Sequence, residues 1–222
     1  GDMSAEAFEM SGLGIPEFLD WVGLQRLPEE IAAQIELWDR KVVWNRRGPL
    51  EHQRFTVRVR NAMEFSARRA MSGAGSGDGQ RCWQVEVETN VFFTRDKSSF
   101  LTPDFLVRRC LERGADTFAG DVVVVGEVLS GSDTPKRRAW KMDRYAEAGI
   151  PWYWEVELDS AGTWDVTEVR AYGLVTVPTR GLTVKPLRPS VYVSVGQWEP
   201  GDGGIEFPEP FGIQIAWDDL AF

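Results

Sequence analysis

The chain has 222 residues, of which 43% are hydrophobic and 27% charged, ordinary values for a globular protein that argue against disorder. Its net charge of −9 speaks against generic nucleic-acid binding through a basic surface. No run of eighteen apolar residues and no secretory pattern at the N-terminus is present, so we expect no transmembrane helix and no signal peptide.

The first third of the chain predicts two helices and a hairpin. Residues 15–21 have apolar side chains at helical spacing, and residues 34–45 contain two strand-like runs that meet at Asp39-Arg40, as in a β-hairpin. Residues 50–71 lack Gly and Pro and place apolar residues near one face, which indicates a long helix. The glycine-rich residues 72–80 are typical of a linker.

Basic residues concentrate between positions 40 and 71, where nine lysines and arginines accompany only Glu51 and Glu64. Residues 1–25, by contrast, contain five acids and no base. The basic stretch is compatible with a surface that contacts phosphate and equally with a solvated helix face. Both interpretations stay open.

The rest of the chain alternates strands with one helix. Strands are predicted over residues 82–93, 103–109, 121–130 and 152–158, and the run Val122–Val125 indicates a strand buried on both faces. A helix is predicted over residues 132–149, with Pro135 in its first turn, Thr134 or Asp133 as its cap and Gly149 at its end. Short strands follow from Thr163. We expect an α/β fold: a helical segment over residues 1–30, then one domain over residues 31–222 with a β-rich C-terminal extension.

The residue inventory narrows the possible chemistry. His52 is the only histidine, and Cys82 and Cys110 are the only cysteines, which excludes a His-rich or Cys/His zinc site. Two cysteines so far apart do not suggest a disulfide scaffold, so a reducing cytoplasm is the expected compartment. No nucleophile elbow and no phosphate-binding P-loop are present. Carboxylate and lysine chemistry with Mg²⁺ or Mn²⁺ remains.

Two acids stand at predicted strand ends. Asp104 follows Pro103 at the start of one strand, and Glu127 lies near the end of the valine-rich strand. An acid there is costly unless a charged partner meets it. If the strands pair, both carboxylates converge on one divalent cation, and Mg²⁺ accepts two carboxylates plus waters. The alternative is an ordinary pair of acids bonded to nearby arginines.

The segment from Pro103 to Leu158 resembles the Uma-type putative restriction endonuclease family, a branch of the PD-(D/E)xK nuclease superfamily. In that family a Pro-Asp strand precedes a buried strand ending in a Glu-Val-Leu-Ser-like turn, a helix then supplies Asp, Lys and Tyr, and an Ala-Gly-x-Pro-x-Tyr-Trp run opens the next strand. The matching residues here are Pro103-Asp104, Glu127-Val128-Leu129-Ser130, Asp133, Lys141, Tyr145 and Ala148–Trp154. The resemblance extends from about Glu36 to the C-terminus.

The resemblance implies a restriction-endonuclease-like core, a mixed β-sheet flanked by helices. It implies Asp104 and Glu127 as ligands of Mg²⁺ or Mn²⁺, and both as catalytic together with Lys141. The lysine of the superfamily normally stands two residues after the second acid, but that position is Leu129 here. Uma-type members supply it from the following helix, where Lys141 matches, and it would orient water or stabilise the transition state. The alternative for Lys141 is a solvent-facing helix residue.

Four further residues are candidates for substrate binding. His52 matches a family histidine at the start of the long helix, although a structural hydrogen bond explains it as well. Asp133 has the alternative of capping the helix. Lys136 lies near a helix start, where a cation meets the dipole unfavourably unless an anion such as phosphate is close. Tyr145 shares the helix face of Lys141, four residues away.

Three functions follow as hypotheses. The first is a metal-dependent endonuclease that hydrolyses nucleic acid, with DNA the expected substrate and a homodimer the expected assembly. The second is a nuclease-like binding or regulatory module without turnover, favoured by the pI of 4.8 and by Leu129 in place of the strand lysine. The third is a hydrolase of small phosphate esters, which predicts a closed pocket.

Overall fold

The computed structural model describes residues 14–45, 48–73, 81–131, 133–178, 180–181, 183 and 186–221. The chain forms two compact units: Gly1–Arg47 with Phe92–Leu101, and Gly48–Val91 with Thr102–Phe222. This division by contacts differs from the expected one at residue 30, and folding of residues 31–222 as one domain stays a prediction. No helix in the described part of the chain is long and apolar enough to cross a membrane.

The first unit is small and built around a hairpin. Its strands β1 and β2 pair through Trp38 and Lys41, and Asp39 and Arg40 both have positive φ, as a two-residue type I′ turn requires. The predicted hairpin is therefore confirmed. The elements of this unit are α2 (Trp21–Gln25), α3 (Glu29–Ala32), β1 (Ile35–Trp38), β2 (Lys41–Trp44) and β5 (Phe100–Leu101).

The helix predicted over residues 15–21 is wrong. Asp20 adopts an extended conformation, and its side chain accepts a hydrogen bond from Gly23 N at 2.7 Å. It is therefore the N-cap of α2, and the helix begins at Trp21, where the prediction had ended it. The apolar spacing before Asp20 does not belong to a helix.

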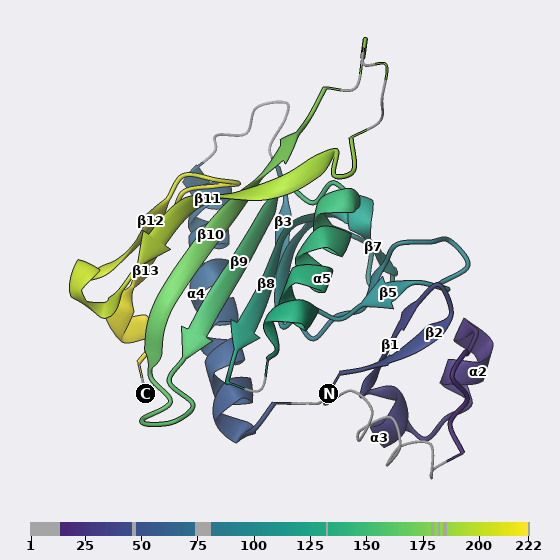
Figure 1. Ribbon diagram of the computed structural model, residues 1–222. Coiled ribbons are helices and arrows are strands. Elements are labelled where there is room, and N and C mark those ends of the chain that lie inside the picture. The colour runs from purple at the N-terminus through teal and green to yellow at the C-terminus, as the bar shows by residue number, and fades with distance from the viewer. Residues whose placement is uncertain are drawn as a thin grey trace. The chain divides into compact units, whose positions relative to one another are not determined.

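A six-stranded mixed sheet forms the centre of the second unit, in the order β11-β10-β9-β8-β6-β3 (Figure 1). Strands β8 and β9 are parallel, and every other neighbouring pair is antiparallel. The predicted mixed sheet is confirmed. The strands are β3 (Trp83–Val87), β6 (Phe105–Arg109), β8 (Val122–Leu129), β9 (Trp152–Leu158), β10 (Val166–Thr176) and β11 (Ser190–Trp198).

Two helices flank this sheet on opposite faces (Figure 1). The long helix α4 (Leu50–Gly73) packs Phe55, Val59 and Met63 into the main core with residues of β3, β6, β8 and β9. Helix α5 (Pro135–Glu147) follows β8, with Pro135 in its first turn and Thr134 as its N-cap. Both helices agree with the sequence prediction.

The C-terminal region adds strands, as expected. β12 (Gly204–Phe207) and β13 (Ile213–Ala216) form a hairpin whose isoleucines belong to the same hydrophobic core as α4. Ser66 Oγ of α4 lies 3.1 Å from both the carbonyl oxygen and the backbone N of Gln214 in β13. The remaining short elements are β4 (Val91–Phe92), β7 (Thr117–Phe118) and the 3₁₀ turns η1 (Ala119–Asp121), η2 (Pro200–Asp202) and η3 (Trp217–Asp219).

Two expectations need correction. The strand predicted over residues 82–93 is interrupted, because Glu88 has a φ of 46° that an extended strand does not accommodate. Cys82 and Cys110 are joined by a disulfide, although their spacing had not suggested one. They lie at facing ends of β3 and β6, a proximity that only the strand pairing creates.

Candidate functional site

Strand pairing brings the two predicted acids together. Phe105 of β6 lies opposite Gly126 of β8 in antiparallel register, so the preceding residue, Asp104, lies opposite Glu127. Val128 N donates to Asp104 Oδ2 at 2.7 Å and ties the two strand ends. A Cβ on Gly126 would overlap the Phe105 ring, so glycine is what allows the strands to approach here.

Helix α5 supplies two polar groups to Glu127. Tyr145 OH donates to Glu127 Oε1 at 2.8 Å, and Lys141 Nζ lies 3.6 Å from the same oxygen. Only 9% of the Lys141 side chain and 10% of the Glu127 side chain is exposed. Lys141 is therefore not a solvent-facing helix residue, and the hydroxyl of the buried Tyr145 is hydrogen-bonded to Glu127.

The first turn of α4 supplies His52 to the other acid. Its Nε2 lies 2.9 Å from the Val128 carbonyl oxygen and 3.4 Å from Asp104 Oδ2. Burial lowers the pKa of His52, but the hydrogen bond and charge of Asp104, the Val128 carbonyl and the charge of Asp133 together raise it to about 9. Burial opposes ionisation of Asp104, yet the hydrogen bond and charge of His52, the Val128 N–H and the charge of Lys141 lower its pKa. The structure thus pairs an imidazolium with a carboxylate.

The other two candidates, Asp133 and Lys136, differ in their surroundings. Asp133 does not cap α5: its Oδ2 accepts from Ser130 N at 3.1 Å and braces the turn after β8, and Thr134 is the cap. Burial raises the pKa of Asp133, and the charge of Asp104 raises it further, against the opposing effects of the Ser130 N–H and the charge of Lys141. Lys136 is exposed on the first turn of α5, and no contact described for it reaches Asp104 or Glu127.

A cavity of about 330 Å³ opens beside this turn. Its lining includes Ser130 and Asp133 but neither Asp104 nor Glu127. It therefore does not enclose the paired acids as a closed phosphate-ester pocket would.

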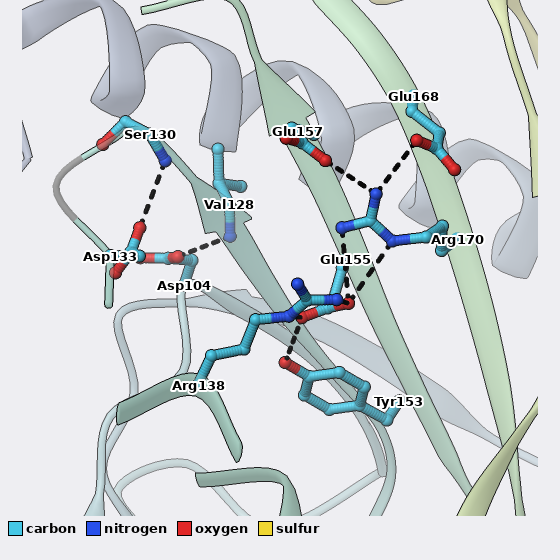
Figure 2. Close-up of polar contacts among 10 residues, drawn as sticks. All are labelled: Asp104, Val128, Ser130, Asp133, Arg138, Tyr153, Glu155, Glu157, Glu168 and Arg170. Carbon is cyan, nitrogen blue, oxygen red and sulfur yellow. Dashed lines mark hydrogen bonds and ion pairs between the residues drawn. The ribbon is translucent and has the colours of Figure 1, made fainter. Parts of the chain in front are cut away.

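A buried ionic cluster next to the paired acids was not predicted from the sequence. Figure 2 shows the guanidinium groups of Arg138 and Arg170 meeting the carboxylate of Glu155, which also accepts from Tyr153 OH at 3.0 Å. Glu155 is fully buried on β9. A signal was available, because an acid inside the apolar run of residues 152–158 requires cationic partners.

The donors present fit a hard, water-rich cation. Two opposed carboxylates with waters satisfy Mg²⁺, which rarely uses a cage made only of protein groups. In the described residues, no group of three or more His, Cys, Asp or Glu side chains is arranged to hold a metal, so a closed protein cage is not formed there. His52 and Lys141 already place positive charge beside the acids. Any bound ion would share these carboxylates with them.

The fold, a mixed sheet flanked by helices with a strand-rich C-terminal region, is restriction-endonuclease-like. A family model described as Uma2, putative restriction endonuclease, matches residues 21–195, and the chain belongs to this family. A crystal structure of a putative nuclease belonging to DUF820 from Anabaena variabilis ATCC 29413 is similar in fold, with a TM-score of 0.55 and 16% identity, over 91% of this chain and 97% of that one. No curated protein matches the chain.

Proposed function

We propose that this protein is a Mg²⁺- or Mn²⁺-dependent endonuclease that hydrolyses phosphodiester bonds in DNA. The observation that supports it best is the opposition of Asp104 and Glu127 at paired strand ends, with Lys141 delivered to Glu127 from α5. Family membership and fold agree with a nuclease. The homodimer expected from the resemblance remains a prediction.

Each of the five site residues would have its own role in the reaction. Asp104 and Glu127 would hold the ion, which when bound helps to ionise a water and neutralise charge on the phosphate. Lys141 provides a nearly desolvated ammonium, a point charge suited to a developing phosphate oxyanion. Tyr145 and His52 fix the orientations of Glu127 and Asp104 through the contacts given above.

A binding or regulatory module without turnover is the second candidate. The observation in its favour is that chain cations already meet both acids: His52 at Asp104 and Lys141 at Glu127. Leu129 also occupies the place of the strand lysine. A site compensated in this way can persist without a metal.

Cleavage of supercoiled plasmid in Mn²⁺ tests the proposal, with Glu127→Gln as the variant and Glu206→Gln, an exposed acid on β12, as the matched control. We expect Glu127→Gln to lose roughly 100-fold or more in rate, as expected when a group that stabilises the transition state is removed. The control should cut at the wild-type rate. Equal cutting by Glu127→Gln would contradict the site, and a wild type that neither binds Mn²⁺ nor cuts DNA would favour the module.

A further inference from the structure

The buried acid Glu155 lies beside Glu127 in the sheet. Strands β8 and β9 are parallel, and their register pairs Glu127 directly with Glu155. Residues paired in this way project from the same face of a sheet. Two acids, one 10% exposed in its side chain and one fully buried, therefore stand next to each other beneath α5.

One face of α5 serves both acids. Arg138, Lys141 and Tyr145 follow each other at intervals of three and four residues, so they lie along one side of the helix. Arg138 meets Glu155 through both Nε and Nη2, whereas Lys141 and Tyr145 meet Glu127. The helix thus contacts the sheet with an ionic pair at one point and the candidate catalytic groups at another.

The Glu155 carboxylate is also held by a residue of the sheet, independently of α5. Arg170 of β10, its antiparallel neighbour, approaches Glu155 Oε1 with Nε and Nη2 at 3.4 Å each (Figure 2). The Nη1 of Arg170 is held in turn by Glu157 at 2.7 Å and Glu168 at 3.0 Å. The carboxylate that receives Arg138 is therefore a rigid anchor.

We infer that Arg138 and Glu155 are positioning residues, whose two-point ion pair sets the placement of α5 so that Lys141 and Tyr145 meet Glu127. A two-point guanidinium–carboxylate pair fixes direction as well as distance, which a single lysine contact does not. The chain needs such a device because Leu129 replaces the strand lysine. Its lysine comes from a helix, and the helix must be held in place.

Simple stabilisation is the competing explanation, and it makes a different prediction. Replacing both members of a buried ion pair by neutral groups often leaves stability unchanged, whereas removing only one member leaves the other as an unpaired buried charge. The double variant Arg138→Met/Glu155→Gln should therefore fold. In this variant Arg170 still has its ion pairs with Glu157 and Glu168. What the double variant should lose is the contact between Lys141 and Glu127.

A double-mutant cycle measures that contact without relying on cleavage. Urea unfolding of Lys141→Met, Glu127→Gln and their combination gives the coupling between the two residues, first in the wild-type background and then in Arg138→Met/Glu155→Gln. We expect coupling in the first background and its loss in the second. Arg144→Met, on the same helix but paired with Glu147, is the matched control and should keep the coupling. Coupling that persists unchanged in the double variant, or is absent in the wild type, would overturn the inference.

The catalytic consequence rests on the proposed function and has its own readout. In plasmid cleavage the double variant should lose about 100-fold in kcat, the scale of a small misplacement of a catalytic group, with KM within about twofold of wild type. A raised KM with unchanged kcat would overturn the positioning role. If the wild type does not cut DNA, the proposed function fails, while the unfolding cycle still decides whether Arg138 and Glu155 position Lys141.

Discussion

At the scale of single residues, His52 is the clearest case of a side chain whose charge is set by its surroundings. It is almost completely buried, yet Nε2 is shared between the Val128 carbonyl and Asp104. Burial alone would keep the imidazole neutral, and the carboxylate overcomes that cost. His52 makes the structural hydrogen bond considered for it, and its contact with substrate stays a prediction.

The pKa of His52 leads to a prediction about pH. Because this pKa is about 9 in the folded protein and 6.5 for an unperturbed histidine, as in the unfolded chain, protonation stabilises the fold fully below pH 6.5, and this contribution is lost as pH rises through 9. The shift corresponds to roughly 3 kcal/mol of unfolding free energy. Between pH 6 and pH 9.5, urea unfolding should show that the unfolding free energy of the wild type falls by that much more than that of His52→Gln. Equal losses in both proteins would contradict the assignment.

At the scale of elements, β6 links the candidate site to a disulfide. Asp104 precedes this strand, and Cys110 follows it at the other end. Cys110 N bonds to the Cys82 carbonyl oxygen at 3.0 Å, which continues the pairing of β3 with β6. The bond closes a loop between cysteines 28 positions apart and ties the edge strand β3 to the strand that carries Asp104.

Removing the disulfide should therefore lower stability and leave the site in place. For a loop of this length, the entropy of the unfolded chain accounts for about 3.5 kcal/mol. We expect Cys82→Ser/Cys110→Ser to lose stability on that order in urea unfolding under oxidising conditions, and to retain the Lys141–Glu127 coupling. Unchanged stability would contradict a stabilising role of the bond. Cytoplasmic localisation stays a prediction, and free thiols at Cys82 and Cys110 in the purified protein would favour it.

At the scale of the whole molecule, the sequence predicted what depends on local pattern and motif. The buried strand β8 and the cap and end of α5 follow from short segments. Asp104, Glu127 and Lys141 were also chosen from short segments, and their roles stay predictions. The contacts that require pairing between distant segments could not be predicted from the sequence. Glu155 could be connected with Arg170 only through the register of β9 and β10, and with Arg138 only through the packing of α5 on the sheet. The disulfide depends in the same way on the register of β3 and β6.

Local pattern also failed where two rules competed. The apolar spacing of residues 15–21 suggested a helix, but the preference of Asp20 for an N-cap decided where the helix begins. In the strand predicted over residues 82–93, alternation continued across Glu88, whose backbone turns out of the sheet. In both places a single backbone conformation overrode side-chain periodicity.

The central claim is that Asp104 and Glu127 share one divalent cation. Anomalous diffraction from crystals soaked in Mn²⁺ tests it most directly, because the signal locates the ion without assuming activity. We predict one strong peak at coordination distance, roughly 2.1–2.2 Å, from an oxygen of each carboxylate, absent from crystals of Glu127→Gln. A peak elsewhere, or none at concentrations that saturate known hard-metal sites, would contradict the claim and favour a nuclease fold that works without a metal.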